Sequence, residues 1–96
     1  MGSYVIRFKV LPEDTTTDLQ KVVESIGSVL PPEAKVRGHK IEPIAFGLSA
    51  VILDVMAPEE EGTIDRVEAA VGKAPLVGQA EMQGVSRMSS KLPPQH

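Results

Sequence analysis

The spacing of apolar residues along this chain switches twice from a period of about 2, typical of strands, to a period of about 3.6, typical of helices, and back. In residues 4–11, one side carries Tyr4, Ile6, Phe8 and Val10, while the charged residues fall on the other side. This alternation predicts a strand with one buried face.

Residues 18–30 predict an amphipathic helix, because apolar residues recur there at intervals of three or four. Thr17 and Gln20 have the spacing of a capping box at its start. The pair Pro31-Pro32 ends the helix, since proline donates no backbone hydrogen bond and restricts the residue before it.

The rest of the chain predicts two strands, a helix and a final strand. Residues 34–41 alternate weakly and are mostly charged, which indicates a short exposed strand. Residues 48–56 are rich in Val, Ile and Leu, which is typical of a strand buried on both faces. A second helix is expected to begin at a capping Thr63 and to stop at Gly72, before a strand in residues 77–88.

The order strand, helix, strand, strand, helix, strand predicts a ferredoxin-like α+β sandwich. Right-handed crossovers then give a four-stranded antiparallel sheet with both helices on one face. Gly84 permits a β-bulge in the last strand. With 96 residues the chain has room for one domain, which we assign to residues 1–88. Residues 89–96 have no apolar face and are expected to form a mobile tail.

Composition excludes several classes of function. The chain has no Cys, so it has neither disulfides nor thiolate metal sites, and its apolar stretch in residues 44–53 is too short to span a membrane. A net charge of −3 and only three aromatic residues argue against direct nucleic-acid binding. Since no signal-peptide pattern is present, we expect a cytoplasmic protein that binds another protein.

No combination of residues suggests covalent chemistry. Neither His39 nor His96 has a ligand or acid–base partner at a workable spacing, and the scattered glycines form no phosphate-binding loop. The acidic run in residues 59–61 is typical of a solvated turn. We therefore expect no metal, no cofactor and no small-molecule substrate.

Positive charge is concentrated in the predicted strand 34–41 of an otherwise acidic chain. The residues concerned are Lys35, Arg37, His39 and Lys40. Such charges either protect an exposed sheet edge from pairing with other sheets or bind and steer an acidic partner. The sequence leaves both interpretations open.

Residues 42–48 form the most informative connection. Pro43 predicts a turn, and Gly47 permits a left-handed backbone directly after the ring of Phe46. Such a loop can push the ring outward, although composition alone favours a ring that plugs the core under the connection.

The run 40–48, Lys-Ile-Glu-Pro-Ile-Ala-Phe-Gly-Leu, and the ending 83–88, Gln-Gly-Val-Ser-Arg-Met, resemble the small archaeal translation elongation factor 1-beta family. That family is similar to the C-terminal catalytic domain of the eukaryotic beta chain. The resemblance covers nearly the whole chain. It implies guanine nucleotide exchange on elongation factor 1-alpha, a GTPase, by a factor that is not an enzyme.

The resemblance also implies roles for individual residues. In the family an exposed aromatic, matched here by Phe46, wedges into the GTPase, and a cation matched by Arg87 reaches toward the magnesium and phosphate site. Family members carry Lys where this chain has Arg87, so Lys91 in the C-terminal extension is an alternative cation. Pro43 and Gly47 are expected to contact the GTPase beside the ring. An auxiliary basic contact is expected from Lys35, Arg37 and Lys40.

We expect the ring and the guanidinium to be presented on one side of the domain. The main alternative function is a ligand-sensing or dimerising ferredoxin-like module that uses the uncovered face of the sheet. An acylphosphatase-like hydrolase is disfavoured, because Glu13 and Asp14 follow the first strand and repel a phosphate. An RNA-recognition module lacks stacking aromatics on its central strands apart from Phe8.

Overall fold

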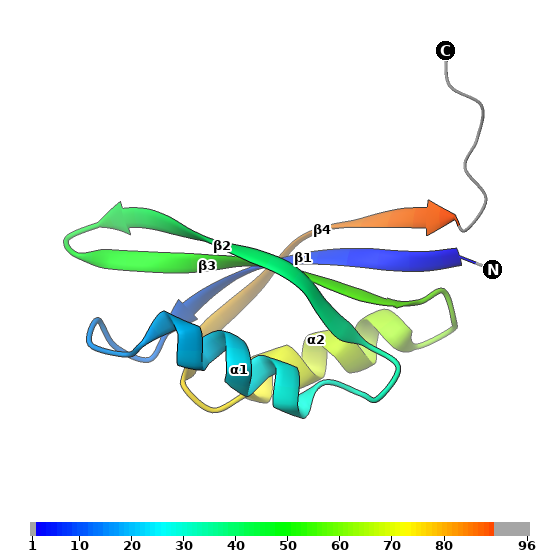
Figure 1. Cartoon of the computed structure of the whole chain (residues 1–96), viewed down its shortest axis with the longest axis horizontal. Helices are drawn as coiled ribbons and strands as arrows, with labels where there is room; N and C mark the ends of the chain where they lie inside the picture. Colours follow the sequence, from blue (N-terminus) through cyan, green and yellow to red (C-terminus); the bar gives the residue numbers. More distant parts are fainter. Residues whose placement is uncertain (1, 90–96) are drawn as a thin grey trace, which may run out of the picture.

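The computed structural model describes residues 2–89, and its elements follow the predicted order (Figure 1). In chain order they are β1 (Gly2–Pro12), α1 (Leu19–Val29), β2 (Lys35–Ala45), β3 (Leu48–Pro58), α2 (Thr63–Lys73) and β4 (Val77–Ser89). Ser89, which the sequence assigned to the tail, ends β4. The rest of the predicted tail, residues 90–96, lies outside the described residues.

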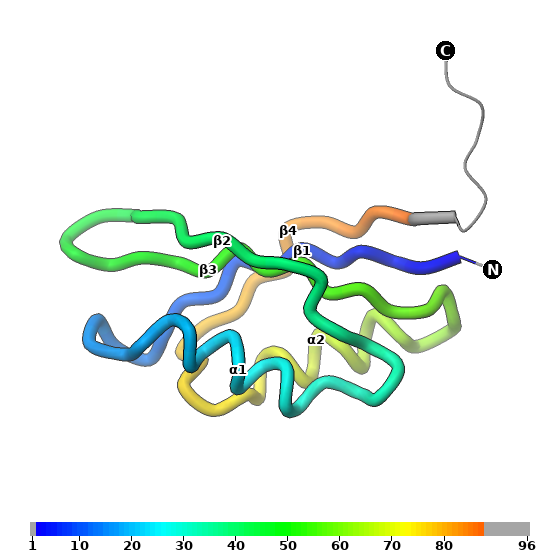
Figure 2. The backbone as a smooth tube through the Cα atoms, in the orientation of Figure 1, coloured from blue at the N-terminus to red at the C-terminus, as the bar shows by residue number. Residues whose placement is uncertain are grey.

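The four strands form one antiparallel sheet in the order β2-β3-β1-β4, and both helices lie on one face of it. This confirms the ferredoxin-like sandwich. The backbone trace shows the β2–β3 hairpin at one end of the sheet and the end of β4, beside the start of β1, at the other (Figure 2).

The hydrophobic core lies between the sheet and the helices. Ile6, Phe8 and Val10 of β1 are buried, which confirms the period of about 2 predicted for this strand. Residues 50–53 of the central strand β3 are buried in succession, as the run of Val, Ile and Leu predicts, although the helices cover only one face of the sheet. The helices contribute the buried residues Val22, Val23, Ile26, Val67 and Val71.

β2 is longer than the sequence predicts. The predicted turn at Pro43 is wrong, because β2 runs on to Ala45 and Pro43 pairs with Ser49 of β3. An edge strand tolerates proline, since every second N–H of such a strand has no partner in the sheet. The ladder shifts register between Pro43 and Ala45.

The residue that caps α1 is Asp18 rather than the predicted Thr17. The Asp18 carboxylate accepts a hydrogen bond from the Gln20 backbone N–H at 2.9 Å. The Thr17 hydroxyl donates instead to the carboxylate of Asp14. Both Thr17 and Asp18 are good capping residues, so the one-residue difference depends on the path of the preceding loop.

We expect Asp18→Ala to lower the free energy of unfolding by about 1 kcal/mol, because the helix loses its N-cap acceptor. Thr17→Ala is the matched control and is expected to change stability by less than about 0.5 kcal/mol, since Thr17 makes no capping bond. Urea unfolding followed by circular dichroism measures both changes. Equal losses in the two variants would contradict the assignment of the cap.

The boundaries of α2 also differ from those predicted. Gly62, with a φ of 82°, is the N-cap, and Thr63 is a buried residue inside the helix. Gly72 does not stop the helix, which continues to Lys73. The bulge predicted at Gly84 is confirmed by a register shift between Arg7 and Phe8 of β1. Neither helix within residues 2–89 is long and apolar enough to span a membrane.

Candidate functional site

Phe46 and Gly47 are the two residues of the turn that joins β2 to β3. Their φ angles are both positive, 55° and 77°, as a type I′ hairpin turn requires. Glycine adopts this conformation freely, whereas another L-residue loses roughly 1–2 kcal/mol there. Phe46 therefore occupies a strained position that Asn or Gly would occupy at lower cost.

The side chain of Phe46 is fully exposed, with a relative accessibility of 102%. The alternative in which the ring plugs the core is therefore excluded. Two more apolar side chains of the same hairpin, those of Ile41 and Ile44, are also exposed. Phe46 thus combines a strained backbone with a side chain that is not buried. This combination is typical of a residue that binds a partner.

Arg87 lies near the end of β4, in register with Tyr4 of β1. Its guanidinium is largely exposed and is bound to the carboxylate of Glu59, the residue that follows β3. The backbone N–H of Glu59 donates to the carbonyl of Gly2, which holds this acid beside the start of β1.

The ion pair shifts the titration of both partners. The hydrogen bond from Arg87 lowers the pKa of Glu59, and the same bond raises the pKa of Arg87 above its ordinary value. Both side chains are therefore charged at neutral pH. Arg87 is a cation that carries its own counter-ion.

The strand register places Phe46 and Arg87 at opposite ends of the sheet, not side by side. Phe46 lies two residues before Leu48, where β3 begins. Arg87 is opposite Tyr4 of β1, and Tyr4 is in turn opposite Ala57, close to the end of β3. At about 3.3 Å per residue, the stretch of β3 from Leu48 to Ala57 is about 30 Å long. The residues that carry the ring and the guanidinium are therefore well separated along the sheet.

The predicted basic residues Lys35, Arg37 and Lys40 lie on β2, an exposed edge strand. Lys35 is opposite Met56, and Lys40 is opposite Ile52. Pro43 and Gly47 belong to the same hairpin as Phe46. Lys91 lies outside the described residues.

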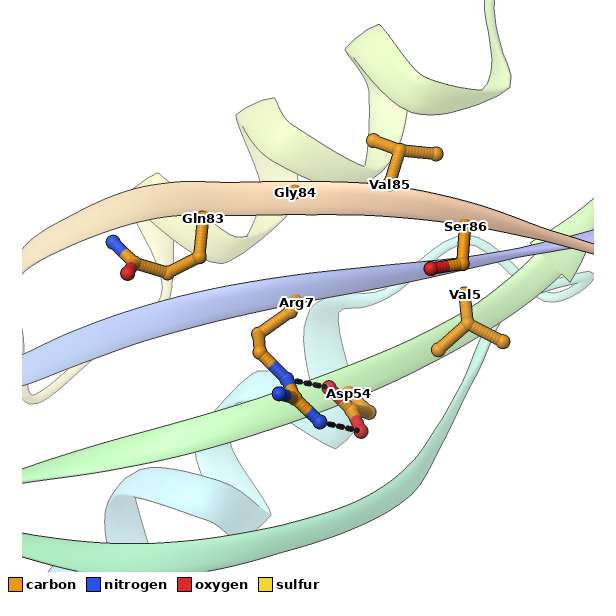
Figure 3. Close-up of a pocket in the computed structure, with 7 residues that line it drawn as sticks. All are labelled: Val5, Arg7, Asp54, Gln83, Gly84, Val85 and Ser86. Carbon is orange, nitrogen blue, oxygen red and sulfur yellow. Dashed lines mark hydrogen bonds and ion pairs between the residues drawn. The ribbon is translucent and has the colours of Figure 1, made fainter.

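The structure adds an ion pair that the sequence did not predict. Arg7 of β1 and Asp54 of β3 face each other in the ladder and form two hydrogen bonds, of 2.9 and 3.1 Å (Figure 3). The hydrogen bond from Arg7 is the main cause of the lowered pKa of Asp54, and Arg37 and Lys40 add to it by their charge. The sequence could not predict this pair, because only the register of β1 against β3 brings Arg7 and Asp54 together.

No group of three or more His, Asp or Glu residues within residues 2–89 is arranged to hold a metal ion. The chemically distinctive features of the described chain are the exposed ring, the Arg87–Glu59 pair and the Arg7–Asp54 pair.

Comparisons with known proteins give a consistent result. Residues 5–88 match the family described as the EF-1 guanine nucleotide exchange domain. Elongation factor 1-beta of Staphylothermus marinus is 40% identical over 90 residues, which cover 93% of this chain and all of that protein. Elongation factor 1-beta of Saccharolobus solfataricus is 38% identical over 92% of this chain and 98% of its own length. The protein of the same name from Archaeoglobus fulgidus is 36% identical over 86% and 94%.

Proposed function

The chain belongs to the family of EF-1 guanine nucleotide exchange domains, and on this premise we propose that it accelerates the release of GDP from elongation factor 1-alpha during translation elongation. The match over residues 5–88 carries this proposal. A nucleotide exchange factor is not an enzyme, because it shifts a binding equilibrium and changes no covalent bond. Because translation elongation takes place in the cytoplasm, we infer that the protein acts there.

Phe46 acts as the wedge. A GTPase holds its nucleotide with loops that have ordered and disordered states, so a side chain inserted between such loops favours the nucleotide-free state. The fully exposed ring at the tip of a hairpin suits this role. The neighbouring residues Pro43 and Gly47 lie on the same hairpin and contact the GTPase with it.

Arg87 acts as the invading cation. Magnesium and phosphate contacts hold GDP in a GTPase, and a positive charge placed at that site competes with the metal. The guanidinium is largely exposed near the end of β4, from which it can reach into a partner. Lys91 in the C-terminal segment is the alternative cation, on the basis of the sequence alone.

The two contacts are made at opposite ends of the domain. Because about 30 Å of sheet separates Phe46 from Arg87, the GTPase must be engaged along the length of the domain rather than at one point. The basic residues of β2, Lys35, Arg37 and Lys40, provide an auxiliary contact between the two ends.

The exchange reaction itself tests the proposal. Elongation factor 1-alpha loaded with a fluorescent GDP analogue is mixed in a stopped-flow instrument with excess GDP, with and without this protein. We expect the protein to raise the rate of release in a concentration-dependent and saturable way. A rate that stays at its spontaneous value would refute the proposed function.

Glu59 is expected to restrain Arg87. The neutral Arg87–Glu59 pair delivers no net charge, so Arg87 must leave Glu59 before it can compete with a metal. Glu59→Gln is therefore expected to raise the stimulated rate of GDP release by about two- to fivefold, the range expected from breaking an exposed ion pair. Stopped-flow release measures this change.

Glu60→Gln is the matched control, since Glu60 is the next acid in the chain and its side chain forms no ion pair within the described residues. It is expected to leave the rate unchanged. The effect of Glu59→Gln should disappear in an Arg87→Ala background. An increase that persists there would mean that Glu59 acts without Arg87.

A further inference from the structure

The sheet has a second face that the helices do not cover. Since Ile6, Phe8 and Val10 point toward the helices, the alternate residues Val5, Arg7 and Lys9 lie on the open face. Residues paired across neighbouring strands share a face, so the register defines rows of side chains on this open face.

Two neighbouring rows carry most of the charged side chains of β1 and its neighbours on the open face. One row runs Lys40, Ile52, Lys9, Glu81 across β2, β3, β1 and β4. The next row runs Gly38, Asp54, Arg7, Gly84 in the same strand order. The Arg7–Asp54 pair therefore forms a ridge with Gly38 on one side and Gly84 on the other. Figure 3 shows the pair and Gly84.

Each glycine leaves a shallow depression beside the ridge. A Cβ atom added at Gly38 or Gly84 would meet nothing within 4 Å. The depression over Gly38 has a volume of about 190 Å³. It is lined by Arg7, Gly38, His39, Lys40, Ile52 and Asp54.

The surface formed by this depression and the adjacent Lys9 is cationic. The carboxylate of Asp54 is already bound by Arg7, while Lys9 and Lys40 form no ion pair with any described residue. Arg37 and Lys40 lie near enough to Asp54 to help lower its pKa. Lys40 thus remains available to an anion. Lys9, on the other side of Ile52, is also available, because its ladder neighbour Glu81 accepts a hydrogen bond from Gln83 rather than from Lys9.

The charges of the whole chain are divided between its two layers. Of the thirteen acidic residues, only Glu42, Asp54 and Glu81 lie on strands, and the other ten lie on helices or connections. The strands carry six basic residues: Arg7, Lys9, Lys35, Arg37, Lys40 and Arg87. An acidic ligand is therefore attracted to the sheet and repelled by the helical layer.

We propose that the open face of the sheet binds an acidic, carboxylate-rich segment of a partner polypeptide, with one carboxylate in the Gly38 depression between Arg7 and Lys40 and the next beside Lys9. This interaction extends the auxiliary contact of β2 onto β1. It stands whether or not Phe46 and Arg87 act in exchange.

A polypeptide fits this face better than a nucleic acid does. Sheets that bind single-stranded RNA stack bases on exposed aromatic rings. Of the three aromatic residues of the chain, Phe8 is in the core, Tyr4 packs against the core and Phe46 lies at the hairpin tip. The open face has no Phe, Tyr or Trp ring on which a base could stack within residues 2–89.

The experiment uses the whole protein with a fluorescent deca-glutamate peptide as probe, without any GTPase. The ionic strength is about 0.1 M, at which exposed charges more than about 10 Å apart are largely screened. We expect saturable binding by fluorescence anisotropy, with amide shifts at Gly38 and Ile52 in the NMR spectrum. The double variant Lys9→Glu/Lys40→Glu is expected to weaken binding by at least about tenfold. Gly38→Val, which fills the depression, is expected to weaken it by about threefold.

Lys21→Glu/Lys73→Glu is the matched control, because it makes the same change of net charge on the helical layer. It is expected to change the affinity by less than about twofold. Equal losses in the two double variants, tighter binding of a single-stranded oligonucleotide, or no binding of the peptide would each overturn the proposal. Since no GTPase is present, these results are independent of the exchange measurement.

Discussion

Replacing Phe46 with Asn is expected to slow stimulated GDP release by at least about tenfold while making the domain slightly more stable. The loss in rate follows because an aromatic side chain that anchors an interface typically contributes about 2 kcal/mol or more. The gain in stability, up to about 1 kcal/mol, follows because Asn-Gly suits a type I′ turn and Phe46 has a φ of 55°.

Stopped-flow release and urea unfolding measure the two effects on the same samples. Phe46→Trp retains an aromatic ring and is expected to keep most of the activity. Val29→Asn is a control for loss of an exposed apolar side chain away from the hairpin. If Phe46→Asn exchanges as fast as the unmodified protein, the ring has no part in the reaction.

Replacing Arg87 with Ala is expected to lower the stimulated rate by at least about tenfold, because no cation then competes for the magnesium and phosphate site. Stability should change little, since the Arg87 side chain is 74% exposed and exposed ion pairs contribute little. Arg87→Lys is expected to retain most of the rate, because a compact ammonium carries the same charge.

The stimulated rate at several free magnesium concentrations provides a sharper readout. Competition with the metal predicts that the advantage of the unmodified protein over Arg87→Ala changes with magnesium concentration. Lys91→Ala distinguishes the two candidate cations. If Lys91→Ala slows release and Arg87→Ala does not, the assignment of Arg87 is wrong.

Local periodicity was sufficient to predict the elements of this fold. The alternation around Phe8 and the stripe through Val22 and Ile26 are properties of neighbouring residues, and they identified a strand and a helix correctly. Pro43 was misread because its effect depends on whether its strand is at the edge of the sheet, which only the strand order decides.

The candidate site was predictable only where one segment contains it. Phe46 and Gly47 are adjacent, so the turn that exposes the ring could be anticipated from the sequence. Glu59 and Arg87 are far apart in the chain, and nothing in their local sequences indicates that they meet. The rows on the open face likewise depend on the register of four strands.

The separation of Phe46 and Arg87 along a hydrogen-bonded sheet has a consequence for turnover. The sheet acts as a rigid spacer between the two residues. Both can bind the GTPase at once, with high avidity, only while the two sites that they occupy on it are the matching distance apart. If Phe46 and Arg87 bind the GTPase as proposed, a conformational change of the GTPase that alters this distance releases one contact and weakens the hold of the other. In the proposed mode of binding, this geometry lets the factor dissociate after each cycle and serve many GTPase molecules.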